Sequence, residues 1–357
     1  MLGKDPSLTE LLEYTLSHKA SDLHIGDGVL PAIRVDTQLI PISEHPFTLE
    51  HTKKLIFEHL SKERYEVFER EKELDYSFGV AGLGRFRVNL FFQRSNIGCA
   101  IRALPFAPMT FEEIGFPKFV AETLMAKPNG LILVTGPTGS GKTTTLATML
   151  DHINTHRSCH IVTIEDPIEF LYKNKKAMVN QREVGADTHS FNQALKHVLR
   201  QDPNVILIGE MRDLETIEIA LAVAETGHLV FATLHTPDAV QSINRIVDVF
   251  PSNQQQQVRV QLSFVLQSII SQQLMQKNGG GLVLAAEILI ANAAIRNLIR
   301  EAKPHQVYSA MQMGQREGMR TLNMSLSELV KTGKISRELA YMKSMDVQEL
   351  ERLLNTK

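Results

Sequence analysis

Residues 136–143 read Gly-Pro-Thr-Gly-Ser-Gly-Lys-Thr and constrain the fold more than any other stretch of the chain. They match G-x-x-x-x-G-K-[ST], the P-loop signature, at every defined position. A short apolar run at 131–134 precedes them and is typical of a buried parallel strand, and residues 143–150 continue as a helix. A strand, a phosphate-binding loop and a helix in this order indicate a nucleotide-binding α/β sheet. The sequence therefore predicts a site for a nucleoside triphosphate.

The chemistry of this loop follows from its residue types. Glycines allow backbone N–H groups to surround phosphate oxygens, and the helix that follows adds the positive end of its dipole. Lys142 is expected to reach the β- and γ-phosphates, and the Thr143 hydroxyl to bind Mg²⁺. The expected phosphate cradle consists of Gly136, Pro137, Thr138, Gly139, Ser140, Gly141, Lys142 and Thr143.

Composition excludes several classes of protein. A net charge of −2 over 357 residues gives no general attraction to nucleic acid or anionic lipid. Two cysteines, Cys99 and Cys159, are too few for a zinc ribbon or a disulfide framework, so no zinc is expected. The chain shows no signal peptide and no apolar run long enough to span a bilayer. These features predict a cytoplasmic protein that is at most peripheral to a membrane.

The pattern of elements changes along the chain and predicts two domains. Residues 1–104 mix short strands and helices, as in a small α+β domain, and residues 84–93 form its clearest alternating strand. Prolines then mark a linker at 105–117. Residues 118–357 form the second domain, where apolar runs alternate with helices, which indicates a parallel sheet with helices on both faces. A helix is expected from about 253 to 275, and its apolar residues are assigned to the core.

Polar residues lie at the ends of three predicted strands of the second domain. Glu165, Asp166 and Glu169 follow the strand at 160–164, and Glu210 follows the strand at 205–208. The strand at 229–233 is preceded by His228 and followed by His235. Since ligands bind at the carboxyl ends of strands in such sheets, each group is expected to face the γ-phosphate.

The second of these strands departs from the usual Walker B pattern, in which the strand ends in Asp followed by Glu. Gly209 stands where that Asp is expected, which leaves Glu210 at the tip of the strand. Metal binding must then rest on Thr143 with help from Glu165, Asp166 or Glu210. Glu210 is the predicted water-positioning base, and a histidine such as His235 can bind the transferred group.

With these motifs in hand, the chain resembles the secretion-ATPase superfamily and, within it, the PilT type of twitching-motility ATPases. The similarity begins at residues 20–24 (ASDLH) and covers nearly the whole chain. TIEDPIEF at 163–170 resembles the Asp box of that family, VILIGEMRD at 205–213 its atypical Walker B motif, and TGHLVFATLHT at 226–236 its His box. AIRNLIRE at 294–301 is the motif that marks the retraction type, and is interpreted as a coupling element.

The resemblance implies an α/β protein with a PAS-like α+β N-terminal domain, a RecA-like P-loop ATPase domain and a C-terminal helical extension. It implies a homohexameric ring that hydrolyses ATP with Mg²⁺ to retract type IV pili. The implied partners are the inner-membrane platform protein and, indirectly, pilin, which places the ring at the cytoplasmic face of the inner membrane. No nucleic-acid partner is expected.

The resemblance also implies that two arginines of the N-terminal domain reach the nucleotide. By strand context these are Arg87 and Arg102, and Arg87 lies on the polar face of its strand. Arg85 and Arg94 are alternatives, and so is an ordinary surface role for all four.

Other functions stay open at this point. Within the family these are an accessory retraction paralogue of the PilU type and a pilus-assembly or type II secretion ATPase, the latter disfavoured because it commonly carries four zinc-binding cysteines. Outside it, a RecA-like nucleic-acid translocase is disfavoured by the near-neutral charge. A small-molecule kinase would need an acceptor pocket or lid, for which no sequence is evident.

Overall fold

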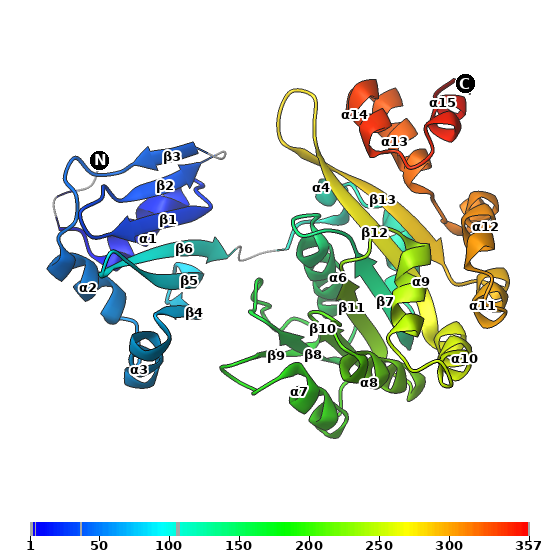
Figure 1. Cartoon of the computed structure of the whole chain (residues 1–357), viewed down its shortest axis with the longest axis horizontal. Helices are drawn as coiled ribbons and strands as arrows, with labels where there is room; N and C mark the ends of the chain where they lie inside the picture. Colours follow the sequence, from blue (N-terminus) through cyan, green and yellow to red (C-terminus); the bar gives the residue numbers. More distant parts are fainter. Residues whose placement is uncertain (1–2, 4, 36–37, 105–107, 356–357) are drawn as a thin grey trace. The chain divides into compact units, whose positions relative to one another are not determined.

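The computed structural model describes residues 3, 5–35, 38–104 and 108–355, which form two compact units (Figure 1). The first unit comprises Met1–Ala107 with Glu169–Leu171, and the second Pro108–Ile168 with Tyr172–Lys357. Residues 105–107, at the start of the predicted linker, lie outside the described residues. The rest of that predicted linker contains helix α4 (Phe111–Ile114), and Phe111 is buried in the core of the second unit.

The first unit is an antiparallel sheet covered by helices, as expected of a small α+β domain. Its six strands have the order β3-β2-β1-β6-β5-β4. On β5, Phe86, Val88 and Leu90 are buried and alternate with more exposed residues, because successive side chains of a strand point to opposite faces. The elements are α1 (Leu8–Ser17), β1 (Asp22–Gly26), β2 (Ala32–Val35), β3 (Gln38–Pro41), α2 (Leu49–Phe57), α3 (Lys62–Glu71), β4 (Glu73–Val80), β5 (Gly84–Gln93) and β6 (Asn96–Leu104).

The second unit is built on a seven-stranded sheet with the order β13-β12-β7-β11-β10-β8-β9. All neighbouring strands are parallel except β12 and β13, which form an antiparallel hairpin. The predicted parallel sheet is therefore confirmed for its central strands and extended by a hairpin at one edge. The strands are β7 (Gly130–Thr135), β8 (His160–Glu165), β9 (Met178–Glu183), β10 (Val205–Ile208), β11 (Leu229–Leu234), β12 (Leu266–Gln276) and β13 (Leu282–Ile290).

Helices cover both faces of this sheet and bury its apolar side chains, so that it is a three-layer structure (Figure 1). One face packs against α4, α5 (Lys118–Met125) and α6 (Lys142–His156). The other face packs against helices that follow later in the chain, namely α7 (Phe191–Val198), α8 (Leu214–Glu225), α9 (Ala239–Asp248), α10 (Gln255–Val265) and α11 (Ala293–Arg300).

The helix predicted from 253 to about 275 is wrong in its second half. Helix α10 ends at Val265, and Leu266–Gln276 form strand β12, which pairs with β7 on one side and β13 on the other. Leu266, Ile269 and Ile270 continue the helical spacing of apolar residues, but such residues suit a buried strand as well as a buried helix, and a short stretch does not distinguish the two. Pairing with β7, more than 100 residues earlier in the chain, decided the outcome.

The C-terminal helices pack on the β12–β13 hairpin and form a small core of their own. Met275 of β12 and Ala285 of β13 are buried there with Leu322, Leu326 and Leu350. These helices are α13 (Leu322–Lys331), α14 (Arg337–Lys343) and α15 (Val347–Asn355), whereas α12 (Val307–Met313) buries Val307 and Met311 in the core of the large sheet. None of the helices in the described part of the chain has the length and apolar character needed to cross a membrane.

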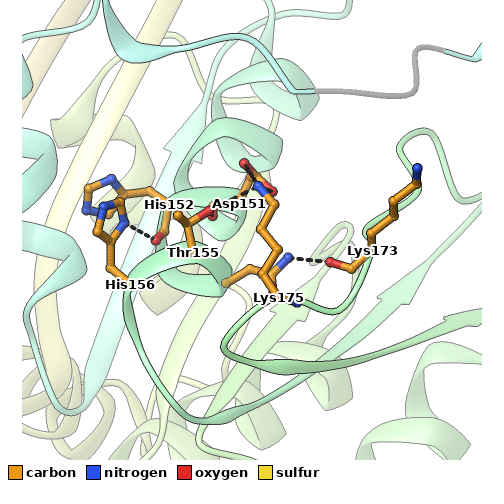
Figure 2. Close-up of polar contacts among 7 residues, drawn as sticks. Asp151, His152, Thr155, His156, Lys173 and Lys175 are labelled. Carbon is orange, nitrogen blue, oxygen red and sulfur yellow. Dashed lines mark hydrogen bonds and ion pairs between the residues drawn. The ribbon is translucent and has the colours of Figure 1, made fainter.

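The loop between β8 and β9 is tied to the C-terminal half of α6 (Figure 2). Asn154, which is fully buried, donates its side-chain amide to the carbonyl of Lys173 at 2.8 Å and accepts the backbone N–H of Lys175 at 3.1 Å. The Lys175 ammonium lies 2.7 Å from both carboxylate oxygens of Asp151. The far end of the loop that begins with Asp166 is thus anchored on the helix that follows the P-loop.

Candidate active site

The P-loop connects the carboxyl end of β7 to the amino end of α6, as the sequence predicts. The Lys142 ammonium bends back over the loop and donates to the carbonyl oxygens of Gly136 at 2.7 Å and Pro137 at 3.1 Å. Thr143 lies half-buried in the first turn of α6. The lysine is therefore held at the loop whose backbone N–H groups bind phosphate in proteins of this type.

Gly136 shows why this position requires glycine. Its φ of +138° is one that residues with a side chain rarely adopt. A Cβ atom added there would lie 2.4 Å from the carbonyl oxygen of Gln272 and 2.6 Å from the Ser140 hydroxyl. The first residue of the P-loop is thus in close contact with β12, an element that the sequence did not place near the site.

The parallel arrangement brings three of the predicted residues to the same edge of the sheet as the P-loop. Since β7, β11, β10 and β8 are neighbours in this order, His235, Glu210 and Glu165 end adjacent strands. The Glu210 carboxylate lies 3.1 Å from Nε2 of His235 and 2.8 Å from Nη2 of Arg212. Glu210 and His235 are thus in direct contact at this edge of the sheet.

The charge state of Glu210 follows from these contacts. Burial alone raises a carboxyl pKa, but the Arg212 hydrogen bond and the charges of His235 and Arg212 outweigh it, so that the pKa of Glu210 is lowered. Glu210 is therefore ionised at neutral pH. Arg212 was not assigned a role from the sequence, although its position two residues after Glu210 in the same motif was a usable signal.

Close packing between neighbouring strands explains why position 209 holds glycine instead of the usual aspartate. A Cβ atom at this position would lie 3.2 Å from the carbonyl oxygen of Ile164 and 3.4 Å from Cα of Glu165. An aspartate at the usual Walker B position would therefore press on the end of β8. Gly209 is held in place by its own N–H, which donates to Ile164 at 2.8 Å, and by its carbonyl oxygen, which accepts from Thr233 at 2.5 Å.

The Glu165 carboxylate accepts hydrogen bonds from two neighbouring neutral side chains. It is 6% exposed, and Oε1 accepts from the Thr163 hydroxyl at 2.6 Å and from Nε2 of Gln181 at 3.2 Å. Asp166, which follows, is exposed, and Glu169 is half-buried. A further buried glutamate, Glu183 of β9, pairs in register with Glu165 and escaped prediction because β9 itself was not predicted.

His228 does not join this group within one chain, contrary to expectation. It precedes β11, and its carbonyl oxygen accepts from the N–H of Gly130 at the start of β7. Its ring is held at the Thr226 hydroxyl and the Val223 carbonyl oxygen, both at 3.1 Å. Because β11 is six residues long, His228 lies roughly 20 Å from the edge that carries the P-loop.

The four candidate arginines of the first unit differ in their contacts. Arg87 and Arg102 face each other in register on β5 and β6. Nε of Arg102 lies 2.8 Å from Oδ1 of Asp22, so this guanidinium already has an anionic partner. Arg85 donates to the Ser77 hydroxyl at 2.6 Å, and Arg94 lies in the turn between the two strands, with a φ of 49°.

The AIRNLIRE residues lie on helix α11 and its C-terminal cap, where Ile295 and Ile299 on one face are buried and Leu298 is half-buried. Arg296 has a structural contact that the sequence did not reveal. Its Nη1 donates to the carbonyl oxygens of Ser263 at 2.5 Å and Phe264 at 2.7 Å, at the C-terminus of α10. This arginine therefore caps the helix that leads into β12.

The donor set at the P-loop edge suits a hard, oxygen-binding cation. Thr143 offers a hydroxyl, and Glu165 and Glu210 offer carboxylates on neighbouring strands. Mg²⁺ needs few protein ligands because it keeps several waters and binds substrate phosphates. Among the residues that the structure describes, no three His, Cys, Asp or Glu side chains cluster closely enough to hold a metal by themselves.

Comparisons with known proteins agree with this geometry. The family model for type II/IV secretion system proteins matches residues 6–355. The type IV pilus retraction ATPase PilT of Pseudomonas aeruginosa is 51% identical over 337 residues, which are 94% of this chain and 98% of that protein. A twitching motility protein of Neisseria gonorrhoeae is 44% identical over 90% of this chain and 86% of its own length. The crystal structure of the pilus retraction motor PilT with bound ADP superimposes with a TM-score of 0.91 at 52% identity, covering 97% of this chain and 99% of that one.

Proposed function

This chain belongs to the family of type II/IV secretion system proteins, and we propose that it is an ATPase motor that hydrolyses ATP to retract type IV pili. The observation that carries the proposal is the contact of Glu210 with His235 and Arg212 at the same sheet edge as the P-loop. That edge offers phosphate-binding backbone, a lysine and an ionised carboxylate together. The similarity to retraction ATPases over nearly the whole chain supports the kind of work that hydrolysis drives.

Each residue has a role that follows from its chemistry. The P-loop N–H groups and Lys142 hold the phosphates, and the Glu210 carboxylate orients the attacking water toward the γ-phosphate. His235 fixes one oxygen of Glu210 and contacts the transferred phosphoryl group, while Arg212 holds the other oxygen and keeps the carboxylate ionised. Mg²⁺, when bound through Thr143 with Glu165 or Glu210, would neutralise charge on the β- and γ-phosphate oxygens.

The active unit in this proposal is a homohexamer in which neighbouring subunits share each site. Arg87 and Arg102 of one subunit then supply positive charge to the nucleotide of the next, a contribution that P-loop enzymes often take from a neighbour. Arg102 must exchange Asp22 for phosphate in doing so. The ring works at the cytoplasmic face of the inner membrane, against the platform protein of the pilus machine.

Replacement of Glu210 by Gln tests the chemistry. The amide keeps the shape of the side chain but cannot attract a water proton, so we expect turnover to fall about a hundredfold or more while ADP affinity is retained. Glu215→Gln is the matched control. Glu215 on α8 forms a surface ion pair with Lys196 on α7, and the loss of this pair should leave turnover within about twofold of the wild type. A Glu210→Gln protein with near-native turnover would remove Glu210 from the mechanism.

Two further experiments test the sharing of sites and the direction of work. Mixing Arg102→Ala with Glu210→Gln subunits should restore activity that neither variant has alone, since a site is intact wherever a Glu210→Gln subunit supplies its arginine to the nucleotide of an Arg102→Ala subunit. No restoration would place the arginine outside the shared site.

Deletion of the gene should leave abundant pili and no twitching, whereas cells without pili would indicate an assembly motor.

A further inference from the structure

Strand β12 runs directly along the P-loop. Its residue Ser271 pairs with Thr135, the last residue of β7, and the two buried hydroxyls are 2.8 Å apart. Gln272 therefore lies beside Gly136, and its carbonyl oxygen is the atom that a Cβ on Gly136 would meet at 2.4 Å. Further along, Leu274 lies 3.3 Å from the Cβ position of Gly141. The strand thus contacts both ends of the loop.

The side chain of Gln272 connects this strand to α6. It is fully buried, and its Nε2 donates to the Thr145 hydroxyl at 2.7 Å. Thr145 is itself buried and lies in the first turn of α6, two residues after Thr143. The bond joins segments 127 residues apart in the chain, and it fixes the turn that carries Lys142 and Thr143.

Two polar atoms of the P-loop and β12 are buried without a partner in the part of the chain that the structure describes. Among the residues that the structure describes, neither Oε1 of Gln272 nor Oγ of Ser140 has a hydrogen bond. Burying an unpaired polar atom is costly, and a leucine would fill much the same space without that cost. Ser140 belongs to the P-loop, and its hydroxyl lies beside the same Gly136 that Gln272 contacts. Packing alone therefore does not account for a glutamine here.

We propose that Gln272 is a positioning residue for ATP hydrolysis. It orients the first turn of α6 through Thr145, and its free oxygen accepts the Ser140 hydroxyl when the P-loop closes around phosphate. This role rests on the proposed function, because it requires that ATP is cleaved at this loop. It also connects the phosphate site to the C-terminal helices, since Met275 on the same strand is packed in their core.

Steady-state hydrolysis by the full chain gives the first test. Gln272→Leu should lower kcat about 10- to 100-fold and change KM for ATP less than about threefold, because phosphate still binds the backbone while Lys142 and Thr143 are misplaced. Gln273→Leu is the matched control, since Gln273 is the next residue of β12 and points to the other face of the sheet. That variant should stay within about twofold of the wild type, and an equal loss in both variants would overturn the proposal.

The partner residue gives a second and independent test. Thr145→Val removes the acceptor and should reproduce the loss in kcat, whereas Thr145→Ser keeps the hydroxyl and should restore it. The double variant Gln272→Leu with Thr145→Val should be no slower than either single one, as expected for two halves of one interaction. Losses that multiply would refute the coupling.

If Gln272→Leu does not fold, the proposal can still be tested with the two Thr145 variants and with Gln272→Asn. Asparagine keeps the amide but shortens the side chain, so it should lose kcat as Leu does, and native kcat in Gln272→Asn and Thr145→Val would overturn the proposal. A wild-type protein that binds ADP yet does not hydrolyse ATP would overturn the proposed function itself. If the wild type hydrolyses ATP and the Gln272 variants have the same kcat as the wild type, only this inference would be overturned.

Discussion

The contact between the P-loop and β12 leads to a prediction about two glycines of the same loop. Gly136 has a φ of +138°, and an added Cβ would lie 2.4 Å from the Gln272 carbonyl oxygen. Gly139 has a φ of +77° and no atom within 4 Å of its Cβ position. Gly136→Ala therefore meets both backbone strain and overlap with a strand that cannot move aside, whereas Gly139→Ala meets strain alone.

The magnitudes separate the two variants. Backbone strain at a positive φ costs about 1–3 kcal/mol, and overlap in a packed region adds about 1–3 kcal/mol. The overlap is present only at Gly136, so ADP affinity should fall further there than at Gly139. At about 1.4 kcal/mol per tenfold, the difference corresponds to roughly 5- to 150-fold in Kd.

The assay is fluorescence anisotropy with labelled ADP, performed on both variants and the wild type, with urea unfolding as a control for the fold. Both variants should still unfold in one main transition, at lower urea than the wild type because strain destabilises the folded state, and Gly136→Ala should be the less stable of the two. If Gly136→Ala binds ADP as tightly as Gly139→Ala, β12 does not constrain the P-loop as the structure indicates.

Two more predictions concern stability. Burial raises the pKa of Glu287 on β13 from 4.5 to about 7, although the Ala239 N–H donates to it at 2.9 Å. The folded protein thus keeps a proton there that the unfolded chain loses above pH 4.5, so the contribution of Glu287 to stability is full below that pH and falls by about 3 kcal/mol as the pH rises through 7. Urea unfolding from pH 5 to 8 should show this decline in the wild type and much less of it in Glu287→Gln; equal declines would contradict the assignment. Asn154→Leu should cost about 1–3 kcal/mol by leaving the Lys173 carbonyl and the Lys175 N–H without their partner. Hydrogen exchange should then accelerate at 173–177, and unchanged protection there would argue against the anchor.

The nucleotide site was predictable because its signals are local. The P-loop is a continuous stretch between a buried strand and a helix, and its glycines have few other uses in that context. The residues Glu165, Glu210 and His235 each follow a buried strand directly, so the parallel order of the sheet was enough to bring them to one edge. The same reasoning did not hold for His228, because this residue precedes β11. The two ends of a strand lie at opposite edges of the sheet, so His228 lies away from the edge that carries the P-loop.

The identity of the loop, the class of ligand and the polar residues at the strand ends were thus determined by the sequence alone, because each depends on neighbours within about ten residues. The tertiary structure alone decided that residues 266–276 form a strand, that Gln272 contacts Gly136 and Thr145, and that Arg102 is paired with Asp22. Those contacts join segments that lie 80 or more residues apart. A short segment such as 266–276 can form a helix or a strand by its own preferences, and the hydrogen bonds offered by a distant strand select between them.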